Sequence, residues 1–294
     1  MLVLSHTQAR AILSTHSGGA AGMEISLDLG LSLASVLFEP YGVRLPDGGC
    51  LSWEGVTVIA GDENGCYLLE QTPGVSEIPG VYDSRKIQLY SELTGRAYSL
   101  YPTSGAPTML VSGLPMHRIK DTDPYRDTLE KIKAARPAGN VLDTCTGLGY
   151  TAIEASKLAH VAHVTTIELD PAALQICRGN PWSQALFDNP KITQIIGDSF
   201  DEIASFPEGA FTRIIHDPPY FSLAGDLYSL EFYRQACRVL SRNGRLFHYI
   251  GDPESKSGRS ATAGVIKRLE QAGFSYIERA PRAFGVVASK DFRL

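Results

Sequence analysis

The stretch Val141-Leu142-Asp143-Thr144-Cys145-Thr146-Gly147-Leu148-Gly149-Tyr150-Thr151 decides the fold, because an apolar run leads into an acidic residue and a turn of small residues. This order predicts a strand over 140–143 that is followed by a tight turn and by a helix from residue 149. Such a unit brings backbone N–H groups and a helix N-terminus close to a nucleoside cofactor. A Gly-x-Gly turn alone is weak evidence, since many turns need glycine for a positive φ.

Three further apolar runs also end in an acidic residue. Glu168 follows 164–167, Asp198 comes shortly after 192–196, and Asp217 comes shortly after 211–215. Because parallel strands end at the same edge of a sheet, we expect four carboxylates to gather there.

The composition indicates a globular protein with a packed core. The chain has 294 residues, of which 44% are hydrophobic, and no apolar run is long enough to cross a membrane. The first residues have no basic segment followed by an apolar core, which argues against a signal peptide. Five scattered cysteines without a Cys-x-x-Cys pair are typical of reduced thiols, so we expect a cytoplasmic protein.

Residues 1–115 differ in texture from the rest of the chain. Short apolar runs at 25–29, 56–59, 67–69, 87–90 and 109–111 are separated by Gly-, Asn- and Pro-containing turns. This density of turns predicts a β-rich N-terminal domain after an initial helix over 5–15. The domain is acidic, with 5 Lys and Arg against 11 Asp and Glu, whereas residues 234–294 carry 12 against 5.

After residue 116 the predicted elements alternate between helix and strand. Asp123-Pro124 is a good helix start, and 125–135 reads as the first helix. The predicted strands are 140–143, 163–168, 192–196, 211–216 and 245–250, and the predicted helices are 149–158, 171–177, 226–240 and 261–272. This alternation predicts a parallel sheet covered by helices on both faces. Runs at 274–279 and 284–289 predict an antiparallel hairpin at the sheet edge.

Residues 116–294 resemble the class I S-adenosylmethionine-dependent methyltransferases, on the strength of the 141–151 stretch and the acidic strand ends. The whole chain looks like a group of predicted methyltransferases that is best represented in archaea. We therefore expect an α/β fold, a Rossmann-like doubly wound, mostly parallel seven-stranded sheet with an antiparallel C-terminal hairpin. A smaller β-rich domain, residues 1–115, would precede it.

The resemblance implies S-adenosylmethionine as the cofactor. Asp143 would balance its ammonium, Glu168 would hold the ribose hydroxyls, and Asp198 would contact the adenine with Phe200 beside it. The full implied set covers the turn and three strand ends: Asp143, Thr144, Cys145, Thr146, Gly147, Gly149, Tyr150, Thr151, Glu168, Leu169, Asp198, Ser199 and Phe200. For Asp143 and Glu168 the alternative role is a strand-end cap, and for Asp198 it is a helix start. The family often has glycine where Cys145 stands.

Asp217-Pro218-Pro219-Tyr220 is the second strong signal. It matches the Asp/Asn-Pro-Pro-Tyr/Phe motif of methyltransferases that act on exocyclic amines and on some amides. Asp217 and the Pro218 carbonyl would accept the two N–H groups of the acceptor, which localises its lone pair, and the prolines would fix the backbone. Tyr220 would offer a face to a base. The alternative is a rigid exit from the strand.

Other polar residues give weaker signals. Cys145 has no nearby His partner, so we favour a packing role over a nucleophile. His117 and Arg118 either take part in the site or belong to a solvated linker. His160 and His163 lack further ligands, so no metal site is expected.

These features favour an N-methyltransferase that acts on an amine or amide nitrogen, with RNA among the candidate acceptors. The acidic N-terminal domain weakens the RNA hypothesis and favours a protein amide or a small molecule. One alternative is an aminopropyltransferase that uses decarboxylated S-adenosylmethionine, although its Gly-Gly-Gly-Asp-Gly motif is absent here. Another is a non-catalytic cofactor-binding module. No membrane partner is expected, and the sequence indicates no oligomeric state.

Overall fold

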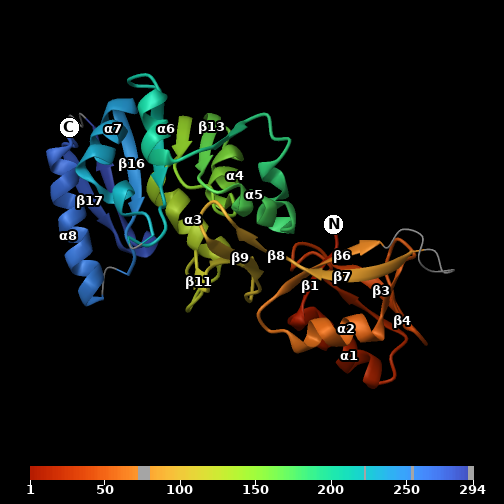
Figure 1. The fold of residues 1–294 in the computed structure, drawn as a ribbon. Coiled ribbons are helices and arrows are strands. Elements are labelled where there is room, and N and C mark those ends of the chain that lie inside the picture. Colours follow the sequence, from red (N-terminus) through yellow and green to blue (C-terminus); the bar gives the residue numbers. More distant parts are fainter. Residues whose placement is uncertain (72–79, 222, 253–254, 291–294) are drawn as a thin grey trace. The chain divides into compact units, whose positions relative to one another are not determined.

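The computed structural model describes residues 1–71, 80–221, 223–252 and 255–290. The chain forms two compact units (Figure 1). Unit 1 comprises Met1–Pro124 and Gln175–Gln184, and unit 2 comprises Tyr125–Leu174 and Ala185–Leu294. The expected domain boundary after residue 115 stays a prediction, and the first segment of unit 1 extends to Pro124.

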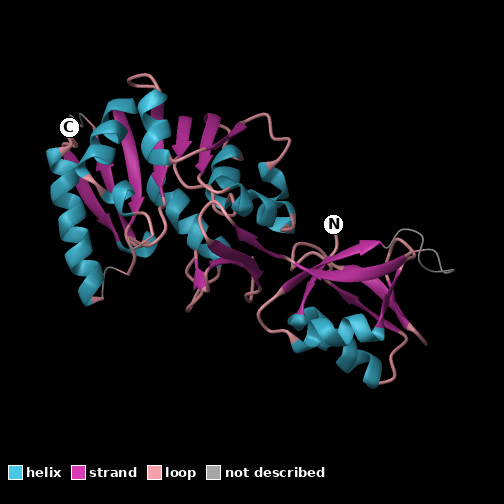
Figure 2. Cartoon of the chain, in the orientation of Figure 1, coloured by secondary structure: helices cyan, strands magenta, loops and turns pink. Residues whose placement is uncertain are grey.

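In its first segment, the described residues of unit 1 form two sheets and the helices α1 and α2 (Figure 2). The first sheet has the order β1-β6-β7-β5-β4-β3-β2. Its strands are β1 Val3–Ser5, β2 Gly22–Ile25, β3 Ala34–Glu39, β4 Gly42–Arg44, β5 Cys50–Ser52, β6 Cys66–Gln71 and β7 Val81–Lys86. The Val3 N–H donates to the Leu27 carbonyl (2.7 Å), so edge strand β1 also contacts the residues that follow the opposite edge strand β2. The second sheet has the order β11-β10-β9-β8, with β8 Gln88–Ser91, β9 Arg96–Tyr101, β10 Thr108–Val111 and β11 Leu114–Pro115.

The two helices of unit 1 are α1, His6–Ser17, and α2, Trp53–Gly61. Ser5 caps α1 in a capping box with Gln8, which agrees with the predicted helix over 5–15. The expectation of a strand at 56–59 is wrong, because these residues lie in α2. Ser52 caps this helix, and Val56, Ile59 and Ala60 are buried at helical spacing in the core of unit 1. Burial of this face outweighs the preference of β-branched residues for strands.

Unit 2 contains a seven-stranded sheet in the order β14-β13-β12-β15-β16-β18-β17, and all its neighbours are parallel except for those of β18. The strands are β12 Gly139–Asp143, β13 Val161–Glu168, β14 Ile192–Ile196, β15 Phe211–His216, β16 Leu240–Tyr249, β17 Tyr276–Ala280 and β18 Gly285–Ser289. This arrangement confirms the predicted doubly wound sheet and its antiparallel C-terminal hairpin.

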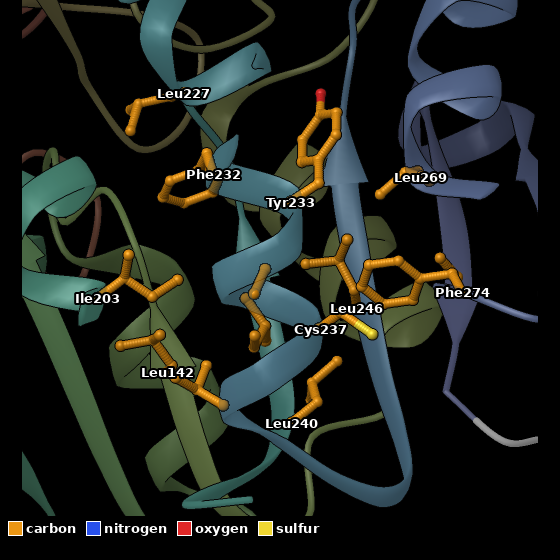
Figure 3. Packing of buried hydrophobic residues seen from close by; sticks show 14 of the residues in the cluster. Leu142, Ile203, Leu227, Phe232, Tyr233, Cys237, Leu240, Leu246, Leu269 and Phe274 are labelled. Carbon is orange, nitrogen blue, oxygen red and sulfur yellow. The ribbon is translucent and has the colours of Figure 1, made fainter. Parts of the chain in front are cut away.

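Helices connect the strands of this sheet (Figure 2). The helices are α3 Pro124–Ala135, α4 Tyr150–Ser156, α5 Pro171–Arg178, η1 Pro181–Leu186, α6 Ser199–Ser205, η2 Gly225–Tyr228, α7 Leu230–Val239, α8 Lys256–Gln271 and η3 Pro281–Ala283. Figure 3 shows the core that Phe232, Tyr233 and Cys237 of α7 form with Leu246 of β16 and Leu269 of α8. Each fully buried side chain of this size stabilises the fold by about 1.5–3 kcal/mol. The packed core thereby fixes the strand ends that carry the polar residues.

Candidate functional site

Four strand ends of unit 2 bring acidic residues to one edge of the sheet. Asp143 ends β12 and Glu168 ends β13, while Asp217 directly follows β15. Strand β12 lies between β13 and β15, and the chain order reverses on either side of it. In open sheets of this kind, ligands bind outside the carboxyl ends of the strands at such a reversal. The fold therefore brings these predicted carboxylates together, with Asp198 beyond β14.

The turn after β12 is fastened to the strands on both sides. Thr144 donates its N–H to the Ile215 carbonyl (3.0 Å), and its hydroxyl lies 2.7 Å from Nδ1 of His216. Thr146 donates its N–H to the Ile167 carbonyl (2.9 Å), and its hydroxyl lies 2.7 Å from that of Thr166. Both threonine side chains are therefore directed into the protein, and they hold the turn in place.

Two glycines shape the rest of the turn. Gly147 has φ 53°, and a Cβ there would meet nothing within 4 Å, so its backbone borders open space. Gly149 has φ 76° and precedes α4, and its Cβ would come within 2.8 Å of Leu186. The N–H of Gly147 donates a hydrogen bond to Oε2 of Glu168 (2.9 Å). The N–H groups of Thr144, Thr146 and Gly147 thus bond within the protein, and the approach of this turn to a cofactor stays a prediction.

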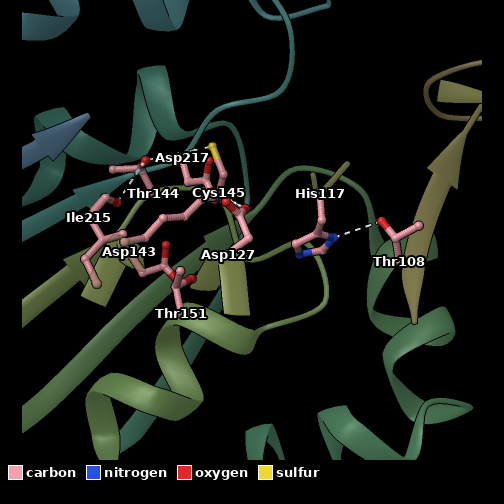
Figure 4. Close-up of polar contacts among 10 residues, drawn as sticks. Thr108, His117, Asp127, Asp143, Thr144, Cys145, Thr151, Ile215 and Asp217 are labelled. Atoms are coloured by element: carbon pink, nitrogen blue, oxygen red, sulfur yellow. Dashed lines mark hydrogen bonds and ion pairs between the residues drawn. The ribbon is translucent and has the colours of Figure 1, made fainter. Parts of the chain in front are cut away.

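Asp143 is a buried carboxylate with few partners (Figure 4). Its Oδ2 accepts hydrogen bonds from the hydroxyls of Thr151 (2.9 Å) and Thr166 (3.2 Å). Its Oδ1 is buried and has no hydrogen-bond partner within the described part of the chain. Burial raises the pKa of Asp143 to about 7, and the nearby charge of Asp217 adds to this shift. Among the described residues, no cation contributes to the pKa shift of Asp143 by stabilising its ionised form.

Glu168 is held by backbone groups at the end of β13. In addition to the Gly147 N–H, its carboxylate accepts the N–H of Asp170 at Oε1 (3.1 Å). Burial nevertheless raises the pKa of Glu168 to about 7, although both N–H groups oppose this shift. The side chain is thus fixed in one orientation, and the neighbouring Leu169 is exposed.

The residues after β14 are largely used by the protein itself. Asp198 is the N-cap of α6, where its Oδ1 accepts the N–H of Phe200 (2.8 Å). Ser199 is buried and donates its hydroxyl to the Thr144 carbonyl, while Phe200 packs against the core. The helix-start role of Asp198 is therefore present in the structure, and its contact with adenine stays a prediction.

Two further residues of the turn region are structural. Cys145 packs against the hydrophobic core, and burial raises the pKa of its thiol well above the usual value. A thiol of this kind is a poor nucleophile, which supports the packing role that the sequence favoured. Tyr150 is buried at the start of α4.

The Asp217-Pro218-Pro219-Tyr220 segment combines an anchored carboxylate with exposed aromatic rings. The Asp217 side chain is 17% exposed, and its Oδ2 accepts a hydrogen bond from Nζ of Lys131 (2.6 Å). The hydroxyl of Tyr228 donates to the Pro219 carbonyl (3.1 Å), which fixes the second proline. Tyr220 and Phe221 are 50% and 65% exposed. One carboxylate and two aromatic faces therefore lie close together along the chain.

Sequence reasoning missed the residues beneath Asp217. Lys131 of α3 is fully buried, and its Nζ lies 2.9 Å from Oδ2 of Asp127 and 4.4 Å from the ring centroid of Tyr249. The spacing of Asp127 and Lys131, four residues apart on a predicted helix, was the only available signal. That spacing is far more common in exposed helix pairs than in buried ones.

His216, before Asp217, serves the packing of the strand end. It is buried, and its Nε2 lies 2.9 Å from the Leu227 carbonyl while Nδ1 faces the Thr144 hydroxyl. Burial lowers the pKa of His216 to about 3, so the ring is neutral. The structural role expected for His216 agrees with these contacts.

Two of the remaining sequence candidates belong to unit 1 rather than to unit 2. His117 belongs to unit 1, where its Nδ1 lies 3.0 Å from the Thr108 hydroxyl, and Arg118 is in the same unit. In the part of the chain that the structure describes, no group of three or more His, Cys, Asp or Glu side chains could hold a metal ion. None of the described helices is both long and apolar enough to span a membrane.

Comparison with known proteins shows which family the chain belongs to. Residues 126–255 match the Methyltransferase small domain family. The uncharacterized protein MJ1233 of Methanocaldococcus jannaschii is 48% identical over 196 residues, which are 66% of this chain and 67% of that protein. The chain belongs to the family of this archaeal protein. Unit 2 is therefore a methyltransferase-like domain, and the sheet edge described above belongs to it.

More distant relatives are named as aminopropyltransferases. The polyamine aminopropyltransferase of Mycobacterium tuberculosis is 28% identical over 162 residues, which are 53% of this chain but only 31% of that protein. A crystal structure of spermidine synthase in complex with the transition-state analogue AdoDATO has a TM-score of 0.57 at 18% identity. That alignment covers 76% of this chain and 80% of the spermidine synthase chain. At this identity the likeness shows the fold alone.

Proposed function

We propose that the protein is an S-adenosylmethionine-dependent N-methyltransferase that acts on an amine or amide nitrogen. The observation that carries the proposal is the Asp217-Pro218-Pro219-Tyr220 segment, which directly follows β15 beside the glycine turn after β12. Its partly exposed carboxylate and aromatic rings are the groups that an N–H-bearing, planar acceptor needs.

The residues of the cofactor end fit S-adenosylmethionine. That molecule carries an ammonium, a sulfonium and two ribose hydroxyls, and when bound it supplies an activated methyl group. Asp143 offers a buried, unpartnered oxygen, and Glu168 offers a fixed carboxylate. Gly147 leaves space where a side chain would otherwise stand. In this proposal Asp143 attracts the ammonium and Glu168 accepts the ribose hydroxyls.

The acceptor end supports transfer to nitrogen. Asp217 accepts an N–H of the acceptor, which orients the nitrogen and raises the electron density of its lone pair. The nitrogen then forms the new N–C bond as the C–S bond breaks, the bonding pair stays on sulfur, and the surplus N–H proton leaves to water. Asp217 stabilises the positive charge that develops on nitrogen.

Tyr220 and Phe221 make a nucleobase one plausible acceptor. Both rings are at least half exposed, and bases stack on such side chains with about 1–3 kcal/mol each. RNA is therefore one candidate acceptor, alongside a protein carboxamide.

The test is transfer of label from methyl-labelled S-adenosylmethionine into RNA, protein and small-molecule fractions of host extract. Asp217→Ala, which removes the group that accepts the N–H of the acceptor, is the inactive variant. We expect label in one fraction with the wild type and none above background with the variant. Absence of label in every fraction, from a protein that binds the cofactor, would contradict the proposal.

An aminopropyltransferase is the second candidate, because several relatives and a structure with the same fold carry that activity in their names. It predicts transfer of an aminopropyl group from decarboxylated S-adenosylmethionine to a polyamine such as putrescine. The same purified protein, tested with both donors, separates the two candidates.

A further inference from the structure

We propose that Arg136, Arg213 and Arg245 form a binding site for a backbone phosphate of single-stranded RNA. The inference rests on the proposed function and selects RNA from its candidate acceptors. Arg136 directly follows α3, while the other two arginines belong to β15 and β16, and all three lie in unit 2.

The sheet brings the two strand arginines to the end of α3. Arg213 and Arg245 are partners in the parallel register of β15 and β16, on strands that run about 4.8 Å apart. Arg213 donates Nε–H to the Arg136 carbonyl (2.9 Å), and Arg245 donates Nε–H to the Ala134 carbonyl (3.1 Å). Both side chains therefore reach the C-terminal end of the helix, where Arg136 stands.

Capping of the helix uses only part of each guanidinium. Nη1 of Arg213 donates to the Thr212 carbonyl (2.8 Å), and Nη2 of Arg245 donates to Oε1 of Glu278 (3.1 Å). Nη2 of Arg213 and Nη1 of Arg245 make no hydrogen bond or ion pair with the residues that the structure describes. A guanidinium carries five N–H donors, so both arginines retain donors for a further acceptor.

Arg136 occupies a backbone conformation that usually selects glycine. Its φ is 50°, and its N–H donates to the Ile132 carbonyl (2.9 Å), which closes the last turn of α3. Its side chain is exposed and forms no hydrogen bond or ion pair within the described part of the chain. A long side chain at positive φ is uncommon, and such outliers gather at ligand sites. We therefore assign the Arg136 guanidinium to a ligand rather than to the fold.

The three arginines carry uncompensated positive charge. Arg245 pairs with Glu278, whose side chain is 42% exposed, whereas Arg136 and Arg213 form no ion pair with the described residues. Burial and the like charges of Arg245 and Arg136 lower the pKa of Arg213. Burial also lowers the pKa of Arg245, and Arg136 adds to that shift while Glu278 opposes it. An anion held between the arginines would offset this repulsion.

A nucleic-acid phosphate suits this set of groups better than another anion. Planar guanidinium groups bind phosphate oxygens in a bidentate way. The same unit exposes the rings of Tyr220 and Phe221, on which bases stack. Residues 234–294 also carry 12 Lys and Arg against 5 Asp and Glu, in contrast to the acidic residues 1–115. Positive charge together with aromatic faces is the combination that single strands bind.

The arginines lie within reach of the acceptor end. Arg213 precedes Asp217 by four residues, which is about 13 Å along an extended chain. Arg136 follows Lys131, the partner of Asp217, by five residues, or about 8 Å along a helix. Phosphates of one strand are spaced by about 3.4 Å along a nucleic-acid helix, so a strand with a base at Asp217 reaches the arginines within about four nucleotides.

The test is fluorescence anisotropy of a labelled single-stranded RNA of about 12 nucleotides with the full-length protein, saturated with S-adenosylhomocysteine, from about 50 to 200 mM salt. The variants are Arg136→Gln and the matched control Arg234→Gln, whose arginine is exposed on α7. Each phosphate contact of a single strand contributes about −0.7 to the slope of log affinity against log salt. We therefore expect Arg136→Gln to reduce the slope by about that amount and to weaken binding about five- to tenfold at the lowest salt, while the control changes neither. Equal slopes in wild type and Arg136→Gln, or the same loss in the control, would overturn the proposal.

Glu278→Gln covers the case in which weaker binding reflects poor folding. The substitution removes the carboxylate that competes for Arg245, so we expect RNA to bind at least about twofold more tightly than to wild type. A misfolded protein would not show this gain. Unchanged or weaker binding by Glu278→Gln would overturn the proposal.

A polyglutamate peptide of similar charge distinguishes RNA from an acidic protein. We expect the peptide to bind at least about tenfold more weakly than the RNA, since it offers no bases to Tyr220 and Phe221. Equal affinity with the same dependence on Arg136 would show that the arginines serve an acidic protein, and would overturn the assignment to RNA.

The two proposals fail differently. Methyl transfer into a fraction, together with RNA binding that does not depend on Arg136, would refute only the phosphate site. Binding of RNA that depends on Arg136, together with no methyl transfer into any fraction, would refute only the proposed function.

Discussion

The carboxylates at the two ends of this site differ in their surroundings. The cofactor end holds Asp143 and Glu168, and the acceptor end holds Asp217. Asp143 and Glu168 are buried beside hydroxyls and backbone N–H groups, and burial raises the pKa of each to about 7. Asp217, at the acceptor end, has the ammonium of Lys131 at 2.6 Å. The chain therefore supplies a counter-ion at one end and leaves the other without one.

The difference indicates which ligand brings positive charge. A buried carboxylate without a counter-ion costs free energy that a cationic ligand recovers on binding. S-adenosylmethionine carries two positive groups and suits the cofactor end. Asp217 already has the ammonium of Lys131 as a counter-ion, so its ionised form is stabilised without a cationic ligand.

The largest expected effect comes from removing the counter-ion at the acceptor end. Loss of one partner from a buried ion pair costs about 3–5 kcal/mol, because the remaining charge is left uncompensated. We therefore expect Lys131→Met to lower the free energy of unfolding by that amount in urea titrations. The exposed Lys133→Met should cost less than about 1 kcal/mol. Equal losses in the two variants would mean that the buried pair contributes nothing special.

The next effect concerns catalysis at the same end. Asp217→Ala removes the carboxylate that accepts the N–H of the acceptor, and we expect the rate of transfer to fall by about 10²–10³-fold, as for other groups that stabilise developing charge. Affinity for S-adenosylmethionine should stay close to that of the wild type. Asp226→Ala, which changes an exposed residue, is the control. A variant that instead loses cofactor affinity would place Asp217 at the cofactor end.

A smaller effect is expected at the cofactor end. Glu168→Ala removes the acceptor for the Gly147 N–H and the proposed ribose contact, so affinity for S-adenosylmethionine should fall by about 1–3 kcal/mol. Glu231→Ala changes an exposed glutamate on α7 and should leave the affinity unaltered. Unchanged affinity in Glu168→Ala, measured by calorimetry, would refute the ribose assignment.

The sequence predicted the acidic strand ends of this site but not the counter-ion of Asp217. The strand ends at Asp143, Glu168 and Asp217 were predicted because apolar runs that end in acidic residues follow directly from the pattern of a parallel sheet. The counter-ion was not predicted. Lys131 lies 86 residues from Asp217, and only the packing of α3 against the sheet reveals that they touch.

The internal contacts of the turn and one element of unit 1 also depend on packing that the sequence does not reveal. The hydroxyls of Thr144 and Ser199 bond to His216 and to the Thr144 carbonyl, and the place of both residues at the cofactor stays a prediction. The helix at Val56 and Ile59 was read as a strand, since β-branched residues favour strands unless a helical face is buried.

The smallest expected effect is on the pH dependence of stability. The pKa of Asp143 is about 7 in the folded protein, against an ordinary value of 3.8. The Asp143 carboxyl loses its proton at about pH 4 in the unfolded chain but only at about pH 7 in the folded protein. The contribution of Asp143 to the free energy of unfolding therefore falls between these two pH values and is constant above them. Asp143→Asn removes it. We expect the variant to gain about 1–2 kcal/mol relative to wild type between pH 5 and 7 in unfolding titrations. A difference that does not change with pH would contradict the raised pKa.

The most direct test of the contrast between the two ends is the number of protons released when S-adenosylmethionine binds. Calorimetry at pH 6.5 in buffers of different ionisation enthalpy measures it, with Asp143→Asn as the control. Asp143 must ionise to attract the ammonium and Glu168 must ionise to accept both ribose hydroxyls. We therefore predict release of about one proton by the wild type, less by the variant, and affinity that rises from pH 6 to 8. Binding without proton release, at an affinity independent of pH, would contradict the account.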